Sequence, residues 1–410
     1  LNSELKIKFP KEIKIKYQLL GTDTAAIQVT KETRRGENTY TFRCINIPAS
    51  KKYGDAPDNS WYANHVVFCI EAYTNDKGEN VPFLSTLDDL YRISYGYIKD
   101  VNKEITPATK AVVDSCIKNV SSDEQKARNI YRWVQQHIKY VAFEEGMEGF
   151  MPRDANLVCN RRFGDCKDMA SILTLMLRQA GLQAYFTWIG TRNLAYKFTE
   201  TPLPMVSNHM ICTLLLNGKY IFLDGTHPTC IFGIPPDGIQ DKEAMVAINE
   251  KEYKILKVPV ADKTSNVLTD STFLDLSDNK VMHGKIKLYN RGYFSMDEHA
   301  RLMYADESNL KQRWRNKLSR GSNKFQLDSL NIVNDGDLTK FNVSAAFSLP
   351  DYAKKIGDEW YINLNLFKFY EHEEIDYPKR KMPVEYDYKY TKAYVTTLTI
   401  PAGYHVGYMP

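Results

Sequence analysis

The sequence predicts an α+β protein in which a core of mixed helices and strands lies between two β-rich, sandwich-like parts. Short runs in the first hundred residues, such as 5–9 and 13–17, alternate apolar and basic residues at period two, which is typical of half-buried strands. Helical periodicity begins after Thr106, and strand patterns return after Val258. We therefore expect an N-terminal β-rich domain over 1–105, a core over 106–258 and a C-terminal β-rich domain over 259–410.

Composition excludes several classes of protein. The 54 basic and 50 acidic residues nearly balance at a net charge of +4, so there is no electrostatic reason to expect a nucleic-acid partner. No apolar run reaches the roughly 18 residues that a transmembrane helix needs. The cysteines form no C-x-x-C pair and the histidines are dispersed, so we expect neither zinc nor any other metal or cofactor.

The two outer parts are predicted mainly as strands. In the first, a loop rich in turn-forming residues over 49–60 precedes a further strand over 65–72. In the last part, a helical insert begins at a Ser295–Glu298 capping box and breaks near Asp306. Its strands are expected over 280–289, 325–333, 340–348 and 393–400, which carry β-branched and aromatic residues between turn signals.

The core opens with a predicted helix and a loop. Ser121 and Glu124 form the pattern of a capping box, and an apolar stripe of helical period follows as far as Ile138. The stretch 141–163 contains glycine, proline and several acids, and we interpret it as a loop. Its acids, Glu144, Glu145 and Glu148, either rim a substrate groove or belong to a solvated loop.

A cysteine occupies the first turn of the next predicted helix. Asp165 and Asp168 have the spacing of a capping box, an apolar stripe follows, and Gly181 stands where a left-handed helix end is expected. Cys166 therefore lies beside unpaired backbone N–H groups and the positive end of the helix dipole, both of which favour the nucleophilic thiolate. Lys167 opposes the dipole but would lower the pKa of a neighbouring thiol.

A histidine and an aspartate lie on a predicted hairpin. Residues 209–216 read as a buried strand, Asn217-Gly218 as a two-residue turn, and 219–224 as the returning strand. In a tight turn of this type Ile211 faces Asp224, which makes His209 and Asp224 diagonal neighbours on one face. Such neighbours lie roughly 7–8 Å apart by backbone, a distance that an imidazole and a carboxylate can bridge.

These segments resemble the transglutaminase-like superfamily of papain-type Cys-His-Asp folds. The matching residues are Arg162 to Asp168, Asn208-His209 and Leu223 to Thr226. The chain is most similar to bacterial, often Bacteroidetes, envelope proteins that place this core between two β-rich domains. The resemblance implies that Cys166 is the nucleophile, His209 the base and Asp224 the residue that orients the base.

Purely structural roles for these residues are the alternative to a catalytic site. The remaining cysteines are expected to be small buried residues, Asp165 and Asp168 to cap the helix, and Asp224 could serve as a turn acid. His227, three residues beyond Asp224, would replace His209 if the hairpin register slipped. The cysteines concerned are Cys44, Cys69, Cys116, Cys159, Cys212 and Cys230.

The predicted activity is acyl transfer through a thioester at Cys166, with a peptide or protein as substrate, cell-wall peptide included. Hydrolysis would make the chain a protease or amidase, and an amine acceptor would make it a transglutaminase. The alternative is a catalytically silent scaffold whose β-rich domains bind a protein, peptide or polysaccharide. The resemblance and the start at Leu1 without methionine lead us to expect a removed upstream segment and a periplasmic or cell-surface location.

Overall fold

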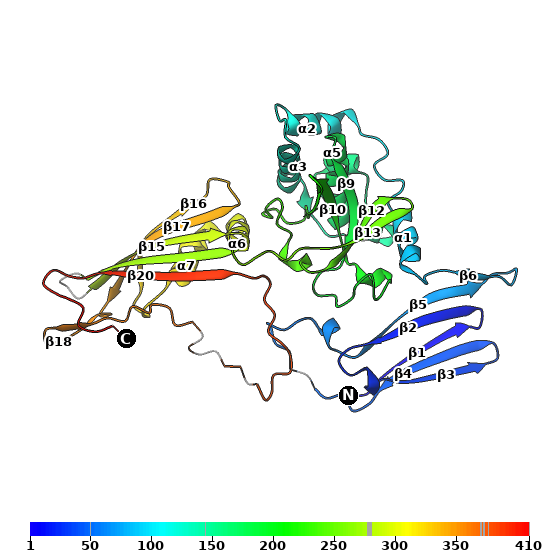
Figure 1. Ribbon diagram of the computed structural model, residues 1–410, viewed down its shortest axis with the longest axis horizontal. Coiled ribbons are helices and arrows are strands. Elements are labelled where there is room, and N and C mark those ends of the chain that lie inside the picture. The colour runs from blue at the N-terminus through cyan, green and yellow to red at the C-terminus, as the bar shows by residue number, and fades with distance from the viewer. Residues whose placement is uncertain are drawn as a thin grey trace. The chain divides into compact units, whose positions relative to one another are not determined.

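The computed structural model divides into two compact units (Figure 1). The first comprises Leu1–Pro228, Pro235–Pro259 and Met382–Asp387, and the second comprises Thr229–Ile234, Val260–Lys381 and Tyr388–Pro410. The structure describes residues 1–49, 51–143, 145–276, 281–369, 371, 374–375 and 377–409. Glu144, position 50 of the expected loop over 49–60 and position 280 of the expected strand over 280–289 lie outside this description. The first unit thus holds both the N-terminal strands and the mixed core.

The N-terminal region of the first unit contains two small antiparallel sheets, as its period-two patterns predict. One has the order β1 (Ser3–Pro10), β4 (Glu37–Cys44), β3 (Gln28–Arg34), and the other β2 (Ile13–Leu20), β5 (His65–Thr74), β6 (Asn80–Pro82). Helix α1 (Leu87–Gly96) was not expected from the sequence, and it begins at a capping box between Thr86 and Asp89.

The core of this unit packs helices on a five-stranded antiparallel sheet. The strand order is β11 (Lys219–Leu223), β10 (His209–Leu216), β9 (Gln183–Ile189), β12 (Glu243–Asn249), β13 (Glu252–Lys257). Helix α5 (Cys166–Gln179) lies against β9 and β10 and is buried from Cys166 to Leu177 (Figure 1). Helices α2 (Pro107–Ile117), α3 (Asp123–His137) and α4 (Ala155–Arg161) pack around α5.

Two local predictions for the core are wrong. The cap of α3 is Ser122, whose Oγ accepts a hydrogen bond from the Gln125 N–H at 3.1 Å. Glu124 does not close a box with Ser121, because its carboxylate accepts two hydrogen bonds from Arg128 one turn along the exposed face. The stretch 141–163 is also not all loop, since Asp154 caps the short helix α4.

The hairpin register is confirmed. Leu216 pairs with Lys219 and Cys212 with Leu223. Both turn residues have positive φ, +50° at Asn217 and +74° at Gly218, which is the backbone of a type I′ turn and explains why this dipeptide fixes the pairing.

The second unit has a five-stranded sheet covered by two helices. The strand order is β16 (Gln326–Val333), β17 (Lys340–Pro350), β15 (Val281–Arg291), β14 (Val267–Leu276), β20 (Thr391–Thr399), with β14 and β20 parallel. Alternate residues of β15 are buried, and this face packs on Trp314 and Leu318. The hairpin β18 (Lys354–Ile356) and β19 (Glu359–Tyr361) lies in the same unit. The expected β-rich character of this part is confirmed.

The helical insert is confirmed, and so is its break near Asp306. Helix α6 spans Tyr293–Met303 and α7 spans Glu307–Leu318. The capping box predicted between Ser295 and Glu298 is wrong, because the helix begins at Tyr293 and its cap residue is Gly292, with φ +62°. Ser295 instead donates a hydrogen bond from Oγ to the Leu338 carbonyl at 2.8 Å.

Candidate active site

Cys166 is the first residue of α5, as predicted. The Asp165 carboxylate accepts hydrogen bonds from the Lys167 and Asp168 N–H groups at 2.9 and 3.3 Å, and Asp168 accepts one from the Asp165 N–H at 3.0 Å. This capping box closes the helix start on both sides of the cysteine. Gly181 adopts φ +82° just past the other end. The thiol is therefore fixed on a rigid, buried helix rather than on a loop.

The backbone N–H of Cys166 points out of the helix end. Within the described part of the chain it forms no hydrogen bond, because the capping carboxylate serves the next two N–H groups. An unpaired N–H at a helix N-terminus attracts negative charge. It can therefore hold the oxyanion that develops when a thiolate at the same residue attacks a carbonyl.

The hairpin brings His209 and Asp224 into direct contact. The imidazole Nε2 lies 2.7 Å from the Asp224 Oδ2, and both side chains are largely buried. His209 is the first residue of β10, and Asp224 directly follows β11. The diagonal relation expected from the turn is thus realised as a hydrogen-bonded ion pair.

Three further contacts hold Asp224 in place. Its Oδ1 accepts hydrogen bonds from the N–H and the Oγ1 of Thr226 at 2.9 and 2.7 Å. The Tyr131 hydroxyl on α3 donates to the Asp224 carbonyl oxygen at 2.7 Å. Gly225 passes so close to α5 that an added Cβ would lie 3.2 Å from side-chain atoms of Met169 and Leu173. Tyr131 and Thr226 were not predicted to support the site, although an Asp-x-Thr turn is a recognisable local pattern.

Electrostatics favour the charged forms of this pair. Burial opposes protonation of His209, but the carboxylate of Asp224 and, secondarily, the thiol of Cys166 raise the imidazole pKa to about 10. Burial likewise opposes ionisation of Asp224, yet the imidazolium and the Thr226 hydrogen bonds lower the carboxyl pKa to about 2. Because Nε2 is engaged by Asp224, Nδ1 is the nitrogen left to interact with the thiol. The arrangement supports a thiolate–imidazolium pair.

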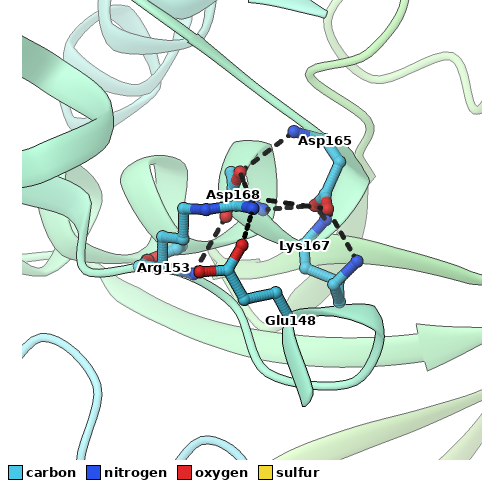
Figure 2. Close-up of polar contacts among 6 residues, drawn as sticks. Glu148, Arg153, Asp165, Lys167 and Asp168 are labelled. Carbon is cyan, nitrogen blue, oxygen red and sulfur yellow. Dashed lines mark hydrogen bonds and ion pairs between the residues drawn. The ribbon is translucent and has the colours of Figure 1, made fainter. Parts of the chain in front are cut away.

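A buried charge cluster surrounds the start of α5 (Figure 2). Lys167 Nζ lies 2.8 Å from the Asp165 Oδ2. Arg153 donates to Asp168 twice, from its backbone N–H at 2.9 Å and from Nη1 at 2.7 Å, and its other Nη contacts Glu148. Of these five residues only Glu148 has an exposed side chain.

This cluster explains how two carboxylates can flank a reactive thiol. Negative charges beside Cys166 would disfavour the thiolate. Lys167 and Arg153 supply two positive charges against Asp165 and Asp168, at distances short enough to neutralise them. The predicted capping role of both aspartates is consistent with the structure. Lys167 forms an ion pair with Asp165. The role of Arg153 was not predicted from the sequence, because its partner Asp168 lies fifteen residues away.

The structure does not bring the rival residues to the site. His227 is exposed, and the contact made by its carbonyl oxygen is with Gln135 Nε2 at 2.8 Å. Cys159, Cys212 and Cys230 are buried elsewhere, and Cys44, Cys69 and Cys116 are half-buried. In the described residues, no group of three or more His, Cys, Asp or Glu side chains is arranged to hold a metal ion. Among the described helices, none is long and apolar enough to cross a membrane.

The helices α3 to α5 carry a family signature. Residues 110–202 match the model of the transglutaminase-like superfamily. This segment is therefore similar to the core of transglutaminase-like proteins. It includes Cys166, whereas His209 and Asp224 lie beyond the matched residues. No curated protein matches the chain significantly.

Several solved structures are similar to this chain. A candidate protease from Parabacteroides distasonis ATCC 8503 is 12% identical, with a TM-score of 0.49 over 85% of this chain and 66% of that one. A candidate cysteine protease from Cytophaga hutchinsonii is 13% identical, with a TM-score of 0.21 over 58% and 82% of the two chains. LapG from Legionella pneumophila is 16% identical, with a TM-score of 0.22 over 35% and 74%. The present chain thus spans just under two thirds of the Parabacteroides protein.

Proposed function

We propose that this chain is a thiol enzyme that cleaves a peptide or amide bond through a thioester at Cys166. The observation that carries the proposal is the imidazole of His209, which is held by Asp224 through Nε2 and interacts with the Cys166 thiol. A nucleophile, a base and a group that orients the base are what covalent acyl transfer needs.

The mechanism follows from these positions. The Cys166 thiolate attacks the amide carbonyl carbon, and the Cys166 N–H stabilises the resulting oxyanion. As the C–N bond breaks, the imidazolium of His209 gives its proton to the departing amine, which leaves a thioester. The neutral imidazole then takes a proton from water, and the hydroxide attacks the thioester carbonyl carbon. The C–S bond breaks, the carboxylic acid leaves, and the Cys166 thiolate and the His209 imidazolium are restored. Asp224 keeps the ring oriented and stabilises its charged form throughout.

The proposed substrate is a peptide or protein, with cell-wall peptide as one option, and the proposed location is the periplasm or the cell surface. Hydrolysis is favoured over amine transfer because no second binding surface for an amine is needed. The similarity of the core to transglutaminase-like proteins supports an acyl substrate.

The first test is the pH dependence of iodoacetamide alkylation at Cys166, read residue by residue by mass spectrometry. A free cysteine titrates near 8.5, whereas a cysteine paired with histidine at a helix start falls to roughly 3.5–7.5. We expect fast labelling well below pH 7 that His209→Ala abolishes. His227→Ala is the matched control, because it removes an exposed imidazole from the same hairpin end and should leave the profile unchanged.

The opposite result would favour a silent scaffold. Cys166 is only 6% exposed, as a merely structural cysteine would be. Slow labelling with an ordinary or raised midpoint, indifferent to His209→Ala, would rule out the enzyme and leave a binding role for the β-rich parts.

A further inference from the structure

A set of exposed apolar side chains lies in the segment that leads to the nucleophile. Single exposed apolar residues are ordinary on protein surfaces, but groups of them mark binding sites. Seven large apolar residues between positions 140 and 163 expose between 36% and 58% of their surface, and all but Leu157 lie outside helix α4. The six outside α4 lie on the strands and loop that lead to Cys166. We define these residues as the apolar rim: Tyr140, Val141, Met147, Phe150, Met151 and Phe163.

The apolar rim is adjacent in space to Cys166. Strands β7 (Lys139–Tyr140) and β8 (Phe163–Gly164) form a parallel pair in which Tyr140 faces Gly164. The Val141 N–H donates to the Gly164 carbonyl at 2.8 Å. Gly164 is followed at once by Asp165 and Cys166, so β8 leads directly to the thiol and β7 lies beside it.

The charge cluster fastens the rest of the apolar rim to the nucleophile helix. Glu148 belongs to a single helical turn, Gly146–Gly149, and contacts Arg153, which in turn binds Asp168 in the first turn of α5 (Figure 2). The Arg153 guanidinium also lies 4.0 Å from the centre of the Phe143 ring. These contacts fix the turn that carries Met147 relative to Cys166, and a surface ordered before binding loses less entropy when a ligand arrives.

We propose, on the basis of the proposed function, that the apolar rim receives an apolar side chain of the acyl-donor peptide next to the bond attacked by Cys166. Any acyl donor must place its carbonyl against the thiol, and the proposal places the chain on one side of that carbonyl along the residues that precede Cys166. Those residues offer aromatic and methionine side chains, which bury apolar groups and adapt to their shape. Exposed Glu145 in the same loop disfavours an acidic side chain there.

The experiment compares chloromethyl ketones of N-acetylated leucine, alanine and aspartate, in which the Cys166 sulfur displaces chloride. Rates of modification at Cys166 are measured on the whole chain by mass spectrometry. The leucine probe should react about tenfold faster than the alanine probe, the scale of discrimination for an added apolar group at a binding site, and the aspartate probe should be slowest.

Two variants remove parts of the apolar rim. Phe163→Ser and Met147→Ser should each reduce the leucine preference to about twofold or less. Phe273→Ser is the matched control, because Phe273 is 44% exposed against 38% for Phe163 and belongs to the second unit. It should keep the full preference.

Iodoacetamide, which carries no side chain, separates this inference from the proposed function. Slow labelling of Cys166 by iodoacetamide, at the rate of an ordinary thiol, would contradict the proposed function. An activated Cys166 that reacts equally with leucine and alanine probes, or that keeps its preference in both rim variants, would overturn the role of the apolar rim alone. A change in sedimentation of the rim variants with no change in probe preference would do so too, because it would make this surface a contact between copies of the chain.

Discussion

The imidazole of His209 and the carboxylate of Asp224 meet at 2.7 Å although they lie fifteen residues apart, at the start of β10 and directly after β11. The two-residue turn at Asn217-Gly218 sets the register of the strands, and the register sets the contact. Lengthening the turn by one residue would move one partner to the opposite face of the sheet. The catalytic geometry therefore depends on a turn that contains no catalytic residue.

Asp224→Asn should weaken the activation of Cys166. The amide cannot stabilise an imidazolium, so the pKa of His209 falls toward its ordinary value and the thiolate loses its cationic partner. For each pH unit by which the midpoint of the labelling profile rises, the labelling rate at a pH below the midpoint falls about tenfold. The measurement is the rate of iodoacetamide labelling of Cys166 at pH 6. Asp241→Asn changes an exposed aspartate of the same unit and should leave this rate unaltered.

The same pair should give the stability of the first unit a defined pH dependence. The raised pKa of His209 stabilises the fold fully below 6.5, and this contribution is lost as pH rises toward about 10. The lowered pKa of Asp224 stabilises the fold above 3.8, and this contribution is lost as pH falls toward about 2. Both are complete between pH 3.8 and 6.5.

Urea unfolding of the wild type and of a His209→Gln/Asp224→Asn double variant tests this dependence. The difference in unfolding free energy between the two proteins should be largest between pH 4 and 6.5 and should shrink toward both extremes. A difference that stays constant from pH 4 to 9 would contradict the pairing. Lys110→Met/Asp114→Asn removes an exposed pair and should give a small difference at every pH.

The parts of the site that the sequence predicts are those determined by local patterns. The capping box at Asp165 and the hairpin register each depend on residues a few positions apart, so Cys166, His209 and Asp224 could be placed before the structure was seen. Helix α4 and the role of Arg153 could not, because Arg153 finds its partner Asp168 across a helix and a short strand. The Ser121 cap failed for a different reason: adjacent serines offer two possible starts, and packing of α3 selects the second.

Gly164→Ala should destabilise the first unit, although the substitution adds only one methyl group. A Cβ at this position would overlap side-chain atoms of Asp168, which is fully buried and closes the capping box. Relieving such an overlap in a packed region costs about 1–3 kcal/mol. Gly238→Ala is the control, because a Cβ there has no described neighbour within 4 Å. Thermal unfolding should show a lower Tm for Gly164→Ala alone, and equal values would contradict the packing described.

Arg153→Met should both destabilise the first unit and raise the pH needed to label Cys166. The substitution keeps an apolar stem but leaves Asp168, which is fully buried, without its cation. Removing one partner of a buried ion pair costs about 3–5 kcal/mol, and the uncompensated carboxylates disfavour a thiolate beside them. Lys110→Met, which breaks an exposed pair, should cost less than about 1 kcal/mol.

The two effects of Arg153→Met are separated by Arg153→Lys. A lysine restores the positive charge but not the two-sided contact with Glu148 and Asp168, since an ammonium lacks the planar fork of a guanidinium. The labelling midpoint should therefore return most of the way to the wild-type value, while the unfolding free energy recovers only in part. If the midpoint followed stability in both variants, Arg153 would support the fold without tuning the thiol, and the charge balance around Cys166 would have to come from Lys167 alone.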